Sequence, residues 1–367
     1  MSWRDRSLLD LLTEHGLEHM PEHEFPNDGW SGATFTSLVD VFGRRNVLKR
    51  TSLAIDWIAR ATRDDDLREG WLAARPQGAL AWIPRAAVPY LGAAADGEGV
   101  AILMPDLSNE LIAWERPGHD PAIDRRTLDL VLGAVARLHA IPWSRIIDGG
   151  GEPDGELPPP WCPLTERLTL LAPQSAGRYA AEGNPVGDRF LAGWAAFGQR
   201  APEAARDLID RLGGNPAPLV AALAGLPSVG LHGDLKLANV ALLPDQQVGF
   251  IDWQMTLEAP IAVELGWFLV SNSGSLPAEP DEVMLSYRDA LEWNAGDRAA
   301  VSKADIGGLV GDWDRQLDLA WIVGLLLRGW RKGLDAEAGG TLPSGVSAGD
   351  DLAWWSARAV EAAERRL

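Results

Sequence analysis

Cysteine is almost absent from this sequence, which has one, Cys162, among 367 residues. A single cysteine excludes an intramolecular disulfide and a cysteine-ligated zinc site, and it is typical of a protein in a reducing cytosol. Basic residues are also scarce: 33 Lys and Arg stand against 52 Asp and Glu, a formal net charge of −19. Because a field of that sign repels nucleic acid and anionic membrane surfaces, we expect no nucleic-acid partner.

Long apolar runs are missing as well. The most apolar stretch, residues 319–327, is far shorter than the roughly 20 residues that a helix needs to cross a bilayer, and Asp318 and Arg328 flank it. The first residues lead into a charged helical pattern without the apolar core of a signal peptide. We therefore expect a cytoplasmic protein without a membrane partner, either a monomer or a homodimer.

The chain is long enough for two compact units or two lobes around one cleft, because 367 residues exceed one typical domain. Its apolar fraction of 46% supports sizeable cores and argues against disorder. Seventeen Trp against three Tyr enlarge the apolar area that each core can bury.

The residue pattern divides the chain into a β-rich beginning and a helical remainder. Residues 1–105 predict a small lobe with an α+β pattern, not alternating βαβ units, and residues 106–367 predict a larger, mainly helical lobe. In the first lobe we predict an extended run over 32–42, a turn at 43–46, a strand at 47–49, an interrupted helix over 53–74 and strands at 79–84 and 100–104. In the second we predict helices over 128–138, 187–199, 203–212, 216–226, 261–270, 280–293, 314–332 and 350–366, with a Gly/Pro-rich loop at 149–160.

One block of the sequence combines residues suited to phosphate chemistry. It reads Leu-His-Gly-Asp-Leu-Lys-Leu-Ala-Asn-Val over 231–240 and ends with Ile-Asp-Trp at 251–253. Between the two parts the pattern predicts a β-hairpin, which would return Asp252 close to Asn239. Carboxylate and amide oxygens are the hard ligands that Mg²⁺ prefers, so Asp234, Asn239 and Asp252 predict a Mg²⁺ site.

This block resembles the aminoglycoside phosphotransferase and choline kinase family of small-molecule kinases. The resemblance implies a two-lobed protein-kinase-like fold, a nucleotide cofactor (ATP or GTP) and Mg²⁺. It implies that Asp234 is the catalytic base toward the acceptor hydroxyl, that Asn239 and Asp252 bind the metal, and that His232 supports the catalytic loop. The motif is specific as a combination, although each part of it is common.

The same resemblance implies nucleotide-binding residues in the first lobe. Lys49 matches the strand lysine that holds the α- and β-phosphates, and Glu69, twenty residues later, matches its ion-pair partner. Ser31 and Gly32 occupy the place of the phosphate-covering loop, where small residues let backbone N–H groups approach. Met104, Pro105 and Leu107 match the hinge strand, with the adenine bonded to the Pro105 carbonyl and the Leu107 amide.

The sequence departs from the family after the metal Asp. Many members carry an Asp-Leu-Ala segment there, and this chain has Val263-Glu264-Leu265-Gly266. We expect Glu264, with its longer side chain, to take the structural role of that Asp. We expect His139 to be a core or capping residue. Asp312, Asp314 and Asp318 lie beside tryptophans, where they either bind an amine-bearing acceptor or serve a helix N-terminus.

The sequence leaves the acceptor open among an aminoglycoside-like antibiotic, a sugar and an amino alcohol. It also leaves a second class of function, a catalytically inactive nucleotide-binding pseudokinase with a regulatory or scaffold role. The joint presence of the lysine, glutamate, aspartate and asparagine residues named above favours the enzyme, because a degenerate site loses members.

Overall fold

The structure is a computed structural model that describes residues 2–25, 29–74, 87–112, 123–141, 161–296 and 308–367. Contacts divide the chain into two compact units: unit 1 comprises residues 1–112, 141–162 and 238–256, and unit 2 comprises residues 113–140, 163–237 and 257–367. The block over 231–253 is therefore shared between the units: residues 232–237, called the HGD loop below, lie in unit 2, and the hairpin lies in unit 1. The lobes expected over 1–105 and 106–367 stay a prediction.

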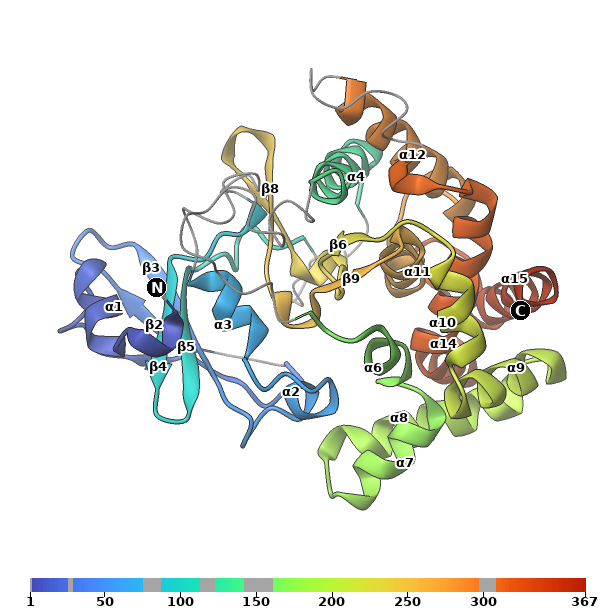
Figure 1. The fold of residues 1–367 in the computed structure, drawn as a ribbon, viewed down its shortest axis with the longest axis horizontal. Helices are drawn as coiled ribbons and strands as arrows, with labels where there is room; N and C mark the ends of the chain where they lie inside the picture. Colours follow the sequence, from blue (N-terminus) through green and yellow to red (C-terminus); the bar gives the residue numbers. More distant parts are fainter. Residues whose placement is uncertain (1, 26–28, 75–86, 113–122, 142–160, 297–307) are drawn as a thin grey trace. The chain divides into compact units, whose positions relative to one another are not determined.

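Unit 1 is built on a five-stranded antiparallel sheet with the strand order β1-β2-β3-β5-β4 (Figure 1). Its strands are β1 (His23–Glu24), β2 (Thr34–Val39), β3 (Arg45–Thr51), β4 (Gly92–Asp96) and β5 (Gly99–Pro105). The central strands β3 and β5 pair over their whole length, from Asn46 opposite Pro105 to Thr51 opposite Val100.

The two faces of this sheet carry different helices, because successive side chains of a strand point to opposite faces. Helix α1 (Leu8–Glu14) buries Leu11 and Leu12 in an apolar cluster that includes Leu48 of β3. Lys49, the next residue, therefore points to the other face, which helix α3 (Arg68–Ala73) covers (Figure 1). The sheet thus separates a purely apolar layer from a face on which charged groups meet.

The remaining elements of unit 1 are short. They are the 3₁₀ helix η1 (Trp3–Asp5), helix α2 (Trp57–Ala61), the two-stranded hairpin of β7 (Val240–Leu243) and β8 (Gln247–Phe250), the 3₁₀ turn η4 (Pro244–Gln246) at its tip, and the 3₁₀ helix η5 (Trp253–Met255) after it. A further 3₁₀ turn, η3 (Leu237–Asn239), lies where the chain passes from unit 2 into unit 1.

Unit 2 is mainly helical. Its helices are α4 (Arg125–His139), α6 (Leu164–Thr169), α7 (Pro173–Ala181), α8 (Pro185–Arg200), α9 (Glu203–Gly214), α10 (Ala217–Ala224), α11 (Ile261–Asn272), α12 (Pro280–Gly296), α14 (Trp313–Ala338) and α15 (Ala348–Arg366), and β6 (Val229–Leu231) pairs with β9 (Leu257–Ala259). Helix α14 is the centre of the unit, because α8, α11 and α15 all pack against it. Among the described residues, none of the helices combines the length and apolar character needed to cross a membrane.

The predicted fold class is confirmed: a β-sheet N-terminal region is followed by a mainly helical C-terminal region. The predicted hairpin between Asn239 and Asp252 is present as β7 and β8. The strand expected at 79–84 and the loop expected at 149–160 lie outside the described residues. The sequence did not reveal β1, β4, α6 or α7.

Candidate active site

The HGD loop follows β6 in unit 2, at the point where the strand ends. Gly233 adopts a positive φ of 84°, a conformation that L side chains rarely adopt, and this bends the chain sharply before Asp234. The His232 side chain is fully buried, and its Nδ1 accepts a hydrogen bond from the Asp234 amide at 3.2 Å. This hydrogen bond contributes to the local shape of the loop, and the supporting role of His232 in catalysis stays a prediction.

Glu264 of α11 fixes the same loop from the opposite side. Its carboxylate accepts hydrogen bonds from the His232 amide at 3.0 Å and from the Gly233 amide at 2.6 Å. Nε2 of His139 donates to it at 2.8 Å, because a carboxylate can only accept. Burial alone would raise the pKa of Glu264, but the hydrogen bond and charge of His139, together with the amides, hold this pKa below its usual range. The glutamate that departs from the family pattern therefore anchors the loop directly.

Two further side chains hold the loop backbone. Arg167 of α6, which is 1% exposed, donates from Nε to the Gly233 carbonyl at 2.8 Å. Asn272 of α11 accepts from the Leu237 amide at 3.0 Å. Glu264 and Asn272 share one face of α11, because positions eight apart lie two turns along the same side of a helix. One helix thus anchors the HGD loop at two points.

The side chain of Asp234 remains partly accessible, at 16% exposed. Its Oδ2 accepts from Nζ of Lys236 at 2.9 Å. A carboxylate on an anchored backbone can accept a proton from a bound hydroxyl. Lys236 was not predicted as a site residue, although Lys236 lies two residues beyond Asp234.

In unit 1, the β7–β8 hairpin brings Asn239 and Asp252 into neighbouring positions. The strands pair with Val240 opposite Phe250, and just beyond that pair the Ile251 amide donates to the Asn239 carbonyl at 3.0 Å. Asp252 follows immediately in the left-handed region, with φ 65°, a conformation that Asp tolerates better than most residues. The register therefore supports the predicted neighbourhood of these two residues.

Asp252 belongs to a polar network with Lys49, Glu69 and Tyr90. Nζ of Lys49 donates to Glu69 at 2.6 Å and to Asp252 at 2.8 Å. The Tyr90 hydroxyl donates to Glu69 at 2.5 Å and accepts from the Asp252 amide at 3.0 Å. The ion pair that the sequence predicted between Lys49 and Glu69 is thus present, and the tyrosine, which the sequence did not indicate, ties it to Asp252.

The electrostatics of this network favour a charged lysine. Burial alone would lower the pKa of Lys49, but the two carboxylates, Asp252 first and Glu69 next, raise this pKa above its usual value. Burial raises the pKa of the Tyr90 phenol well above its usual value, so the hydroxyl keeps its proton and can donate to Glu69. A cation fixed on β3 in this way is suited to hold an anionic phosphate chain.

Arg68 of α3 connects the same network to the segment after Asp252. Its guanidinium, 1% exposed, donates to the Gln254 carbonyl at 2.8 Å, and the Gln254 side chain donates to Asp56 at 2.8 Å. Since α3 also carries Glu69, these bonds fix the distance between the glutamate and Asp252. Arg68 was not predicted as a site residue, because a charged residue on a short helix has no distinguishing pattern.

The expected Mg²⁺ ligands in unit 1 are the side-chain oxygens of Asn239 and Asp252, a donor set that suits this hard cation. The Asp252 side chain is 36% exposed, whereas that of Lys49 is 5% exposed, so the carboxylate can reach an ion that also binds water and phosphate. The described residues contain no cluster of three or more His, Cys, Asp or Glu that could hold a metal alone. An ion bound here would take its other ligands from water and phosphate.

The segment expected to cover the phosphates lies against residues 52–57. Gly32 has a φ of 95°, and a Cβ on it would lie 2.4 Å from the Ile55 carbonyl oxygen, so only glycine fits there. The Ser31 carbonyl accepts from the Trp57 amide at 3.2 Å, and the Ser31 hydroxyl accepts from the Ala33 amide at 3.3 Å. These contacts define the loop, and its part in phosphate binding stays a prediction.

The hinge residues end β5. The Asp106 amide donates to the Arg45 carbonyl at 3.0 Å, and antiparallel pairs alternate, so the next pair, Asn46 and Pro105, is not hydrogen bonded. Within the described residues, neither the Pro105 carbonyl nor the Leu107 amide has a hydrogen-bond partner. Both groups fit the adenine contacts expected of them. Met104, buried at 7% exposure, precedes them in the strand.

The acidic residues near the start of α14 serve the protein itself. Asp312 caps the helix by accepting from the Arg315 amide at 3.0 Å. Asp318 forms ion pairs with Arg365 at 2.6 Å and with Arg366 at 2.7 Å. Asp312 and Asp314 thus lie at the helix N-terminus, whereas Asp318, further along the helix, pairs with the two arginines.

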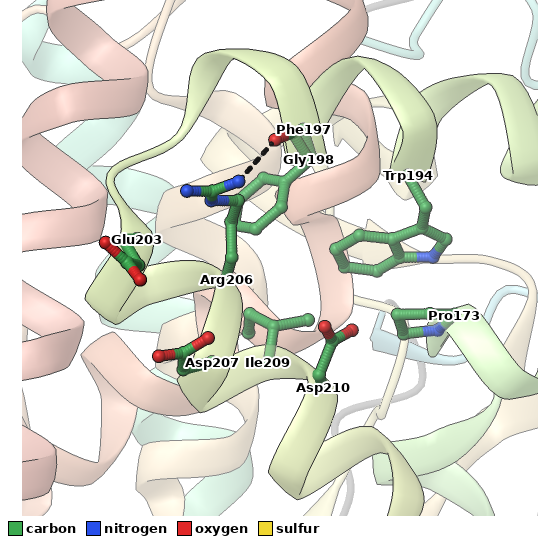
Figure 2. Close-up of a pocket in the computed structure, with 9 residues that line it drawn as sticks. All are labelled: Pro173, Trp194, Phe197, Gly198, Glu203, Arg206, Asp207, Ile209 and Asp210. Atoms are coloured by element: carbon green, nitrogen blue, oxygen red, sulfur yellow. Dashed lines mark hydrogen bonds between the residues drawn. The ribbon is translucent and has the colours of Figure 1, made fainter.

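A pocket of about 360 Å³ lies elsewhere in unit 2, between α7, α8 and α9 (Figure 2). Its polar lining is exposed: Glu203, Asp207 and Asp210 follow one another on the outer side of α9, and Arg206 donates to the Gly198 carbonyl at 3.1 Å. None of the predicted site residues lines it, so it gives no support to a second catalytic centre.

An anchored HGD loop, an ion pair between a strand lysine and a helix glutamate, and an Asn/Asp hairpin together define a phosphotransferase of the protein-kinase-like class. The model of the phosphotransferase enzyme family matches residues 22–301. The chain belongs to this family, and the predicted enzyme class, a small-molecule kinase, is confirmed.

Solved structures of similar proteins share low sequence identity with the chain. An aminoglycoside-3'-phosphotransferase of type VIII is 20% identical, with 82% of this chain and 93% of that chain covered and a TM-score of 0.43. The macrolide 2'-phosphotransferase MphH from Brachybacterium faecium is 18% identical (96% and 97% covered, TM-score 0.43), and the choline kinase LicA from Streptococcus pneumoniae is 10% identical (96% and 97% covered, TM-score 0.45). No curated protein matches the chain.

Proposed function

We propose that this chain transfers the γ-phosphate of ATP or GTP to a hydroxyl of a small polar molecule, with Asp234 as the catalytic base. The observation that carries the proposal is the anchoring of the HGD loop: Glu264, Arg167 and Asn272 bind its backbone and leave the Asp234 carboxylate accessible. A backbone fixed on three sides is what precise positioning of a reacting hydroxyl requires.

In the proposed reaction Asp234 orients the acceptor hydroxyl and accepts its proton. The acceptor oxygen forms a bond to the γ-phosphorus, and the bond from that phosphorus to the β–γ bridging oxygen breaks, leaving the nucleoside diphosphate with the electron pair. Lys236, beside Asp234, is placed to neutralise charge on the transferred group. Bound Mg²⁺, held by Asn239 and Asp252, supplies charge neutralisation on the phosphates.

The nucleotide is proposed to bind in unit 1. Lys49 holds the α- and β-phosphates, and Glu69 with Tyr90 keeps its ammonium in place. Ser31 and Gly32 lie over the phosphates, and Met104, Pro105 and Leu107 bind the adenine. The proposed acceptors are those that the sequence left open: an aminoglycoside-like antibiotic, a sugar or an amino alcohol.

The test compares wild type with Asp234→Asn, which keeps the shape of the side chain and removes its basicity. Mg·ATP or Mg·GTP should raise the melting temperature of both proteins by mass action. By ³¹P NMR, wild type should phosphorylate the acceptor, and the rate of transfer should be about 10²–10⁴-fold lower in the variant. Asp210→Asn, an exposed change on α9, serves as the control and should keep full activity. An active Asp234→Asn enzyme would remove Asp234 from the mechanism.

A further inference from the structure

Several arginines in the described part of unit 2 pair with a carboxylate, whereas Arg328 of α14 does not. Arg331, one turn further along α14, pairs with Asp335 at 3.0 Å, and Arg365 and Arg366 share Asp318. Arg328 has no hydrogen bond or ion pair among the residues that the structure describes. In a chain with a net charge of −19, an arginine without a counter-ion calls for a physical explanation.

Tryptophan rings hold the guanidinium of Arg328. Its central carbon lies 5.4 Å from the ring centroid of Trp267 and 5.3 Å from that of Trp330. Trp267 on α11 and Trp330 on α14 are buried, at 4% and 0% exposure, so the rings cannot move aside easily. Cation–π contacts stabilise the charge of Arg328 but leave its five N–H donors unused.

The same tryptophan links Arg328 to the catalytic loop. Arg167, whose Nε donates to the Gly233 carbonyl, lies 4.7 Å from the Trp267 centroid. Trp267 thus contacts two guanidinium groups, one bound to the HGD loop and the other without a counter-ion. Both contacts lie inside unit 2, so Arg328 has a fixed place near Asp234.

The charges that act on Arg328 include that of Asp234. The pKa of Arg328 is lowered to about 10, by burial first and then by the positive charge of Arg331, with Arg189 of α8 adding to the effect. Asp234 and Asp335 act in the opposite direction. Each of these carboxylates already has a cation of its own, Lys236 and Arg331 respectively. At neutral pH Arg328 is still charged, and the cluster has an excess of positive charge.

We propose that Arg328 binds an anionic group of the acceptor, a carboxylate or a phosphate monoester, while the acceptor hydroxyl lies at Asp234. A guanidinium is the side chain best suited to two parallel hydrogen bonds with such an oxyanion. A sugar phosphate or a hydroxy acid fits this assignment, and an amine is disfavoured because the charge of Arg328 repels it. The inference rests on the proposed function, since it assigns the acceptor to the Asp234 loop.

A purely structural role for Arg328, as a cation that packs between tryptophans, is the competing explanation, and the chain contains a matched control for it. Arg358 of α15 lies 5.8 Å from the Trp321 centroid and 5.2 Å from that of Trp354, and it forms an ion pair with Asp281. Arg358→Met removes a similar guanidinium from a similar pair of rings, without touching the catalytic loop.

The first experiment measures anion binding with no need to know the acceptor. Thermal shifts are recorded in saturating Mg·ADP with added inorganic phosphate or acetate, for wild type, Arg328→Met and Arg358→Met. We expect at least one of the two anions to stabilise wild type and Arg358→Met, and neither to stabilise Arg328→Met. Equal shifts in all three proteins, or no shift in wild type, would overturn the proposal. A missing shift with Mg·ADP itself would instead contradict the proposed nucleotide site.

The second experiment uses matched acceptors: hydroxy acids against their amides, sugar phosphates against the free sugars, and amino alcohols. Wild type should phosphorylate an anionic member in preference to its neutral or cationic counterpart. Arg328→Met should raise KM for that acceptor about 100-fold, with KM for the nucleotide unchanged, and Arg328→Lys should recover part of the loss. Preference for a neutral or cationic acceptor, or an unchanged KM in Arg328→Met, would refute the anionic assignment while leaving phosphotransfer intact.

Discussion

The carboxylate of Glu264 lies 2.8 Å from Nε2 of His139, and both side chains are almost completely buried. From this position Glu264 also accepts the backbone amides of His232 and Gly233, so a helix-borne anion fixes the loop that carries Asp234. Many members of the family have a shorter Asp in the corresponding segment. The longer glutamate side chain therefore performs the anchoring here, and its removal should affect both folding and catalysis.

Glu264→Gln should destabilise the protein by about 2–4 kcal/mol, because one of the two loop amides then faces an NH₂ group in a buried site. The loop would lose its fixed position, and kcat should fall about 10–100-fold. Urea denaturation and steady-state kinetics measure the two effects. Full stability together with full activity would show that the loop is held without Glu264.

The stability that Glu264 contributes should depend on pH in a definite direction. The folded state lowers the pKa of Glu264, so its stabilising contribution is present above the pKa of an unfolded glutamate, about 4.3, and is lost as the pH falls through the folded value. Wild type should therefore lose more stability than Glu264→Gln between pH 5 and strongly acidic solution. Parallel losses would mean that Glu264 is not the titrating group.

The pKa of Asp64 is shifted upward, in the opposite direction to that of Glu264. Burial raises its pKa to about 6, with the Arg68 charge opposing, so its contribution to stability is greatest below the unfolded value and declines as the pH rises through 6. A shift of about two units corresponds to at most about 3 kcal/mol. The stability of wild type relative to Asp64→Asn should therefore fall between pH 4 and 7, as measured by urea denaturation; a constant difference would contradict the raised pKa.

The motifs of the catalytic block could be predicted from the sequence because their residues lie close together along the chain. The hairpin register follows from two apolar runs with a turn between them, so the neighbourhood of Asn239 and Asp252 could be predicted. Tyr90 could not, because it contacts Asp252 across 162 positions and no local pattern marks a lone tyrosine. β4, whose sequence is Gly-Ala-Ala-Ala-Asp, has low strand propensity, and its pairing with β5 decides its structure.

Tyr90→Phe tests the network that the sequence did not reveal. The change removes one hydroxyl, so the Asp252 amide loses the Tyr90 oxygen as acceptor and Oε1 of Glu69 loses the Tyr90 donor, while Lys49 still donates to Oε2. We expect a loss of about 1–3 kcal/mol in stability and a KM for Mg·nucleotide about 10-fold higher, with KM for the acceptor unchanged. Tyr179→Phe is the control, because Tyr179 lies in unit 2 and donates to the Leu170 carbonyl. An equal effect on nucleotide KM in both variants would exclude a specific role for Tyr90.

Asp252→Asn tests the proposed metal ligand. Asparagine tolerates the left-handed backbone at this position, so the loop should keep its shape while the ligand loses its charge. A Mg²⁺ ion bound through a neutral amide is held less tightly, and the Mg²⁺ concentration for half-maximal activity should rise at least about 10-fold. The Lys49 ammonium also loses one of its two carboxylate partners. The affinity for nucleotide without metal should therefore rise or stay unchanged.

The control for this change lies on the same hairpin. Asp245, at the tip, is exposed and also has a positive φ, 59°. Asp245→Asn therefore makes the same chemical change at a second position with a left-handed backbone. Titrations of activity against Mg²⁺ for wild type, Asp245→Asn and Asp252→Asn should coincide for the first two and separate for the third. If all three curves coincide, Asp252 does not bind the metal, and the proposed ligand pair of Asn239 and Asp252 has to be abandoned.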